Sequence, residues 1–133
     1  MLDALARVFD DSGRLTGVSR TMFEGDRSFI TAYALQFEGL TAVFRTEPDY
    51  DTLDVTIGQL EVEPVEVVEE VGGLPPWSKC IGLDVSCAWR LTNQQGYSDG
   101  VRFEFGKPSE KSKVLLELLV VASAIQLFVV LQP

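Results

Sequence analysis

The sequence predicts a mainly β (β-rich α+β) fold, a curled antiparallel sheet of barrel or sandwich type with about one or two short helices. Two observations favour this class. Apolar side chains recur with a period of two along most of the chain, which is the spacing of a half-buried strand. Turn-forming residues separate these stretches, so we expect about seven to nine short strands. The 133 residues are enough for one globular domain over 1–133.

The first half of the chain contains three alternating stretches. Residues 28–38 place Tyr33, Leu35 and Phe37 on one face, and a tight turn at Glu38-Gly39 leads to a second strand over 40–45. The turn cluster Pro48–Asp51 precedes a third, half-buried strand. Its alternating residues are Leu53, Asp54, Val55, Thr56 and Ile57.

The clearest strand covers residues 83–92, where apolar and mostly polar residues alternate. This phase places Cys87 and Trp89 on the buried face, so we predict that Trp89 is a core residue. Val101, Phe103 and Phe105 alternate in the same way after the next turn. The two strands are therefore predicted to form a hairpin with an aromatic apolar face.

The tail is apolar on both faces over 114–121 and 125–131, which is typical of central strands. Ala122, Ser123 and Ala124 mark a bulge or bend, and both one bent strand and two strands remain open. A membrane span is disfavoured because Glu117 interrupts the stretch.

Helix signals are weaker. Leu2, Leu5 and Phe9 have helical spacing, but the same segment also alternates. Residues 64–71 begin with a proline and end before two glycines, which favours a helix, although valines oppose it. Residues 74–77 contain two prolines and must be extended or turn-like.

The net charge of −9 comes entirely from residues 47–70, which we call the acidic window. It contains no Lys or Arg, whereas acids and bases balance elsewhere. A single-signed surface of this kind favours association with a basic protein, and the scattered bases disfavour nucleic acid. The predicted acidic face consists of Glu47, Asp49, Asp51, Asp54, Glu61, Glu63, Glu66, Glu69 and Glu70.

The sequence contains few of the residue patterns that catalysis or metal binding requires. The chain has no histidine, which excludes Ser–His–Asp and Cys–His arrangements. Cys80 and Cys87 form no zinc-binding pattern and suit a reduced, cytosolic chain, and Met1–Asp3 shows no secretory signal. Asp49, Asp51 and Asp54 do not match a calcium loop. We expect no metal, cofactor or membrane association. A carboxylate pair, Asp99 with Glu104 or Asp84, remains possible for hydrolysis.

The turn over 93–100 joins the two best strands and is the most distinctive stretch. Three amide side chains, two glycines and a tyrosine follow one another there. These groups could bind a ligand, or the Asn and Asp side chains could satisfy the loop's own backbone. The binding candidates are Trp89, Asn93, Gln94, Gln95, Tyr97 and Asp99.

Residues 89–100 read W-R-L-T-N-Q-Q-G-Y-S-D-G. This run resembles the signature of a family of small bacterial proteins of uncharacterised function, in which a Trp precedes an N-Q-Q-G-Y-x-D-G turn. Ile81-Gly82 and residues 121–125 resemble that family too, and the likeness is vague elsewhere. The resemblance implies a bacterial origin and a compact domain, and it supplies no activity.

Three hypotheses follow for the function. The first is a non-catalytic cytosolic binding module, immunity-like in one version, that meets a basic protein through its acidic face and the polar turn. The second is a small-ligand binder or carboxylate-based hydrolase with a pocket walled by Trp77, Trp89 and Tyr97 near Asp99. The third is a homo-oligomer held by the apolar tail strands.

Overall fold

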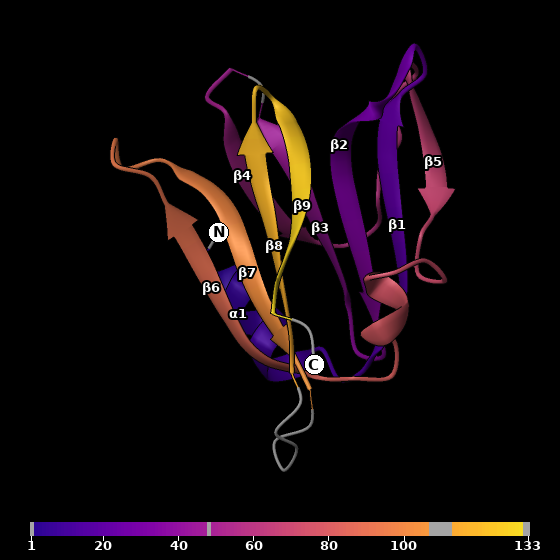
Figure 1. Cartoon of the computed structure of the whole chain (residues 1–133), viewed down its shortest axis with the longest axis vertical. Helices are drawn as coiled ribbons and strands as arrows, with labels where there is room; N and C mark the ends of the chain where they lie inside the picture. The colour runs from indigo at the N-terminus through magenta and orange to yellow at the C-terminus, as the bar shows by residue number, and fades with distance from the viewer. Residues whose placement is uncertain (1, 48, 107–112, 132–133) are drawn as a thin grey trace.

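The computed structural model describes residues 2–47, 49–106 and 113–131 and shows two antiparallel sheets (Figure 1). The first sheet has the order β4-β3-β2-β1-β5 and the second β6-β7-β8-β9. The described elements are α1 Leu2–Asp11, β1 Leu15–Phe23, β2 Asp26–Phe37, β3 Thr41–Glu47, β4 Thr52–Ile57, β5 Glu66–Glu70, the 3₁₀ helix η1 Trp77–Lys79, β6 Val85–Thr92, β7 Ser98–Phe105, β8 Val114–Val121 and β9 Ala124–Leu131. The predicted mainly β class is confirmed, as a sandwich rather than a closed barrel.

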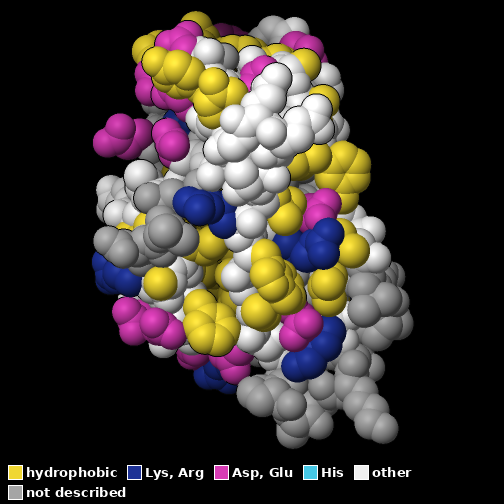
Figure 2. Space-filling model, turned by 90° about the vertical axis from the view of Figure 1, so that its left-hand side faces the viewer, with side chains coloured by type: hydrophobic (Ala, Val, Ile, Leu, Met, Phe, Trp, Pro, Cys, Tyr) yellow, Lys and Arg dark blue, Asp and Glu magenta, His cyan; other side chains and the backbone are white. Residues whose placement is uncertain are grey.

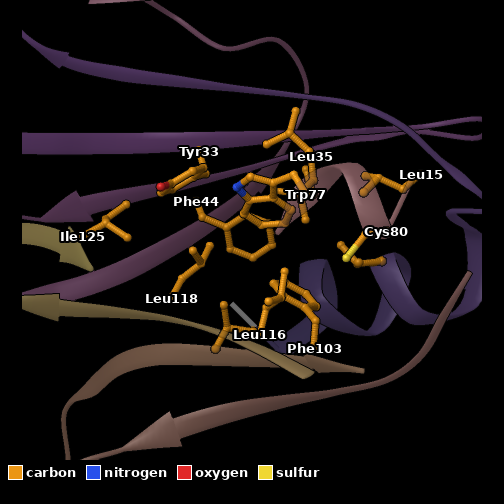
Figure 3. Packing of buried hydrophobic residues seen from close by; sticks show 14 of the residues in the cluster. Leu15, Tyr33, Leu35, Phe44, Trp77, Cys80, Phe103, Leu116, Leu118 and Ile125 are labelled. Carbon is orange, nitrogen blue, oxygen red and sulfur yellow. The ribbon is translucent and has the colours of Figure 1, made fainter. Parts of the chain in front are cut away.

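The two sheets enclose one core. Phe44 of β3 packs edge-on against Phe103 of β7, with ring centroids 5.2 Å apart. Trp77 projects from η1 into the same core beside Tyr33, and Figure 3 shows both rings among the aliphatic side chains of the two sheets. Trp77 is only 2% exposed, so it cannot wall an open pocket with Trp89 and Tyr97.

The first sheet folds as a meander from β1 to β4, and β5 returns to pair with the free side of β1. The connection between β4 and β5, residues 58–65, crosses the outer face of this sheet (Figure 1). We call it the crossing segment. Pro48 of the predicted turn cluster lies outside the described residues.

The structure decides the two segments in this half for which the sequence shows weak helix signals. Residues 66–70 form strand β5 rather than a helix, because Val67 and Val68 pair with Met22 and Thr21 of β1 and their branched side chains suit a sheet. At the N-terminus, residues 2–11 do form helix α1, which buries Leu5 and Val8 and packs against β6.

The apolar tail forms two strands. Ala122 and Ser123 connect β8 to β9 with φ values of 51° and 68°, and two residues of positive φ are what a type I′ hairpin turn requires. Within the described part of the chain, no helix combines the length and hydropathy needed to cross a membrane.

The prediction that Trp89 is a core residue is wrong. A register shift between Val85 and Cys87 inserts a bulge, and beyond it Ala88 lies opposite the buried Phe103. Cys87 and Trp89 therefore point away from the core, and Trp89 is 41% exposed. Val101, Phe103 and Phe105 are buried as predicted.

Candidate functional site

The turn between β6 and β7 is organised around the side chain of Asn93. Its Oδ1 accepts hydrogen bonds from the backbone N–H groups of Gln95, at 2.9 Å, and Tyr97, at 3.2 Å. The backbone of Asn93 also donates to the Tyr97 carbonyl and accepts from Gly96. The amide oxygen thus satisfies the loop's own donors, which is the structural role that such a turn needs.

The other predicted binding residues in and near this turn do not converge on one site. Gln94, Gln95 and Tyr97 are exposed at the tip, and Gly96 adopts a φ of 87°. Asp99 is half-buried and accepts a long 3.4 Å hydrogen bond from Asn93 Nδ2. Trp89 lies on the outer face of β6, away from the tip.

The carboxylates considered for hydrolysis do not converge. Asp99 and Glu104 lie five positions apart on β7, which corresponds to about 17 Å along a strand and exceeds the spacing of a hydrolytic carboxylate pair. Glu104 accepts a 2.6 Å hydrogen bond from Ser86 Oγ. Asp84 precedes β6, where its backbone bridges to Arg14 and accepts from Gly106.

The acidic window is divided between buried and exposed groups. The side chain of Glu66 is only 3% exposed, so it does not belong to an exposed acidic face. Glu69 pairs with Arg20 at 2.8 Å, and Glu70 accepts from Ser19 Oγ at 2.6 Å. The exposed members are Asp49, Asp51, Asp54, Glu61, Glu63 and Glu70, whereas Glu47 and Glu69 are half-buried.

Glu66 anchors the crossing segment to the sheet. Arg45 Nη1 donates to Glu66 Oε2 at 2.9 Å, and Arg45 Nη2 donates to the carbonyl of Glu61 at 2.5 Å. The Thr31 hydroxyl and the Glu63 N–H also donate to the carboxylate. Burial alone would raise the pKa of Glu66, but these hydrogen bonds outweigh it and hold that pKa below its ordinary value.

Apolar side chains stand exposed along and beside this anchored segment. Val65 is 58% exposed and shares a hollow of about 600 Å³ with Phe23, Glu24 and Asp26. Val62 and Val68 line a second hollow of about 550 Å³ against the outer face of the first sheet. We call this area the acidic–apolar surface; it comprises Phe23, Glu24, Asp26, Glu61, Val62, Glu63, Val65 and Val68.

The acidic–apolar surface is held in shape from both sides. The ring of Phe23 packs on that of Phe29, with centroids 4.8 Å apart. The N–H of Glu24 donates to the carbonyl of Val65 at 2.8 Å. The exposed side chains thus project from a hydrogen-bonded backbone, so the surface is preorganised for contact. Sequence reasoning located its acids but missed Phe23 and Arg45, because neither lies in the acidic window.

On the other side of the acidic window, a groove of about 450 Å³ is lined by Arg45, Glu47, Asp54 and Glu61, among others. Asp51 accepts a 2.8 Å hydrogen bond from Ser123 at the β8–β9 turn. Among the described residues, no cluster of three or more acidic or cysteine side chains is arranged to hold a metal ion.

The outer face of the second sheet combines apolar residues with one central ion pair. The register places Trp89, Arg102, Glu117 and Phe128 in one row across the four strands, and Arg102 pairs with Glu117. Figure 2 views the molecule from the side where α1, β6 and β7 lie in Figure 1 and shows hydrophobic side chains interleaved with charged ones.

The two cysteines are free. Cys80 is buried beside η1, and this burial raises the pKa of its thiol to about 12. Cys87 is half-buried on the outer side of β6. Cys80 is therefore a packing residue with no thiolate at neutral pH, which removes it as a nucleophile.

A family model described as "Family of unknown function (DUF6334)" matches residues 4–133. No curated protein and no solved structure matches the chain.

Proposed function

The chain belongs to this family of unknown function, and we propose that it is a non-catalytic module that binds a basic, amphipathic segment of another protein. The observation that carries the proposal is the acidic–apolar surface, where exposed valines alternate with glutamates on a segment fixed by the Arg45–Glu66 pair. Lysine or arginine side chains of the partner would meet the glutamates, while its apolar residues would cover Phe23 and the valines.

The composition of this surface suits protein recognition. Interfaces combine an apolar centre with a polar rim, and an apolar centre supplies most of the affinity. The surrounding negative charge speeds encounter with a basic partner by about 10- to 1000-fold at low salt. We therefore expect affinity to come from the valines and Phe23, and association rate from the glutamates.

A more specific form of the proposal is an immunity-like protein that neutralises a basic toxin in the bacterial cytosol. Three features support it: the small size of the chain, its net charge of −9, and its two unpaired cysteines. The exposed tip of the Asn93–Gly100 turn offers Gln94, Gln95 and Tyr97 as a second contact for the same partner.

Affinity capture from a lysate of the source organism tests the proposal. Wild-type bait is compared with Glu61→Lys/Glu63→Lys, which reverses two exposed charges while keeping the backbone bonds of both residues. Asp10→Lys/Asp11→Lys on the exposed part of α1 makes the same charge change elsewhere. Capture is repeated at ~0.1 M and ~1 M salt, where the screening lengths are about 10 and 3 Å.

We expect a basic protein that both wild type and the α1 variant recover at low salt, that high salt releases, and that the Glu61/Glu63 variant loses. A Val65→Ser/Val68→Ser bait should lose the same protein already at low salt, although its charge is unchanged. The proposal is wrong if no partner is recovered, if salt does not affect recovery, or if both charge variants lose the partner equally.

A further inference from the structure

Four strands lie at sheet edges: β4 and β5 in the first sheet, and β6 and β9 in the second. Each edge strand presents unpaired backbone N–H and C=O groups to its surroundings. Soluble proteins protect such edges with charged side chains, bulges or short strands, because an unprotected edge pairs with another strand.

Three of the four edges carry this protection. β5 is five residues long and contains three glutamates, and β4 contains Asp54. β6 contains Arg90 and the bulge that follows Val85. By contrast, the sequence of β9 is Ala-Ile-Gln-Leu-Phe-Val-Val-Leu, without a single charge or proline.

The edge of β9 is also accessible. Phe128, Val129 and Val130 are 44%, 46% and 43% exposed, although they are consecutive and large. In the described part of the chain, the backbone bonds of β9 run to β8, and none runs from β9 to a turn or loop. The free groups of β9 therefore form a row to which an extended strand can pair.

We propose that the β9 edge pairs with β9 of a second copy of this chain, so that the two four-stranded sheets become one continuous sheet across a two-fold axis. An antiparallel strand pair is self-complementary under such an axis, so one sequence supplies both sides. The neutral edge favours this occupant, because it offers no charge to select a basic or acidic strand and none that would repel its own copy.

The charges near the edge fit the same arrangement. On the adjacent strand β8, Glu117 is neutralised by Arg102, so no unpaired charge of that row faces the partner copy. The acidic–apolar surface belongs to the other sheet and to the crossing segment, and it includes no residue of β9. Pairing of one strand buries less than the ~1,200 Å² of tight interfaces, so we expect a reversible dimer with dissociation in the micromolar range.

Analytical ultracentrifugation of the full chain between ~1 and ~200 μM tests the proposal, since this range brackets micromolar dissociation. Phe128→Lys/Val130→Lys places charges on the exposed edge. Val121→Lys places one on β8, an inner strand, at a residue that is exposed to a similar extent. Wild type and Val121→Lys should double in mass with concentration, and the edge variant should remain monomeric. Circular dichroism verifies the fold of each variant.

Cysteine cross-linking provides a second measurement if the edge variant fails to fold. Gln126→Cys and Phe128→Cys place thiols on one face of β9. A two-fold axis through residue 126 or 128 places one of these thiols opposite its own copy, and an axis through residue 127 places the two thiols opposite each other, so each variant is oxidised alone and in an equimolar mixture of the two. Mild oxidation should yield covalent dimers from at least one of these samples, above the level of wild type and Val121→Cys.

Three results would overturn the proposal. The first is a monomeric wild type over the whole concentration range. The second is a wild-type dimer that persists unchanged in a folded Phe128→Lys/Val130→Lys variant, which would place the contact elsewhere. The third is cross-linking of Val121→Cys as efficient as that of both β9 cysteines.

Discussion

Replacing Arg45 by alanine tests whether the buried Glu66 carboxylate fixes the crossing segment. The substitution removes the Arg45 hydrogen bonds to Glu66 and to the carbonyl of Glu61. Removing one partner of a buried ion pair costs ~3–5 kcal/mol. Arg45 is 29% exposed, and Thr31 and the Glu63 N–H still donate to the carboxylate. We therefore expect a smaller loss, of ~2–3 kcal/mol.

Urea and thermal denaturation followed by circular dichroism measure this loss. For a chain of this size, ~2–3 kcal/mol corresponds to a fall in Tm of about 6–15 °C. Arg14→Ala is the matched control, because Arg14 pairs with Glu38 at the same 2.9 Å distance but on the exposed surface. Exposed pairs contribute little, so the control should shift Tm far less. Equal losses for the two variants would refute the role of the buried anchor.

The pH dependence gives the same prediction a second test. The pKa of Glu66 in the folded chain lies below 4.5, its ordinary value. The folded state then binds fewer protons than the unfolded state, so this stabilisation is complete above pH 4.5 and is lost as pH falls below it. Arg45→Ala removes the strongest interaction that lowers this pKa. The stabilities of wild type and variant should therefore converge in acid, and parallel curves would contradict the assignment.

Three further predictions concern single residues. Gly96→Val should cost ~1–2 kcal/mol, because Gly96 adopts a φ of 87°, whereas Gly73→Val at an open position should cost less; chemical denaturation of both checks this. Trp77→Ala should cost ~3–5 kcal/mol and Trp89→Ala clearly less, because only Trp77 is buried; equal losses would contradict the orientation of β6. Cys80 should react with a thiol reagent only on unfolding, and labelling of the native chain at Cys80, detected by mass spectrometry, would be inconsistent with its burial.

Several strands of both sheets were predictable from the sequence. Residues 28–38, 40–45 and 53–57 correspond to β2, β3 and β4, and the tail corresponds to β8 and β9. Among them β4 alternates most regularly, with Leu53 and Val55 buried between more exposed neighbours, so the side-chain pattern alone identifies its buried face. The family resemblance drawn from residues 89–100 is likewise supported by a family match over 4–133.

Strands with bulges were not predictable in the same way. β1 was missed because the register shift between Leu15 and Gly17 leaves Thr16 as an extra residue that interrupts its alternation. In β6 the strand was found but its phase reversed after the bulge, which moved Trp89 from the core to the outer face. A bulge is decided by pairing with the neighbouring strand, and that information lies outside the local sequence.

At the candidate site, too, the local sequence did not reveal which side chains are buried. The acids of 47–70 were visible as a run, yet the run did not reveal that Glu66 is buried. That burial depends on Arg45, which lies 21 residues earlier, and on Thr31, 35 residues earlier. Only the pairing of β3, β2, β1 and β5 in one sheet brings these groups together. Charge patterning therefore locates an anionic region, while the tertiary fold decides which acids are surface and which are anchors.

If both proposals hold, dimerisation through β9 and partner binding through the acidic–apolar surface affect different rate constants. The acidic–apolar surface lies on the first sheet and the β9 edge on the second, so pairing through β9 leaves both surfaces of a dimer free. A partner with two basic segments, or two partners on one scaffold, would then bind with avidity that a monomer lacks. Immobilised partner should accordingly release Phe128→Lys/Val130→Lys faster than wild type, whereas the Glu61→Lys/Glu63→Lys variant should fail to associate with it. Equal dissociation of the dimeric and monomeric forms would show that the two surfaces act independently.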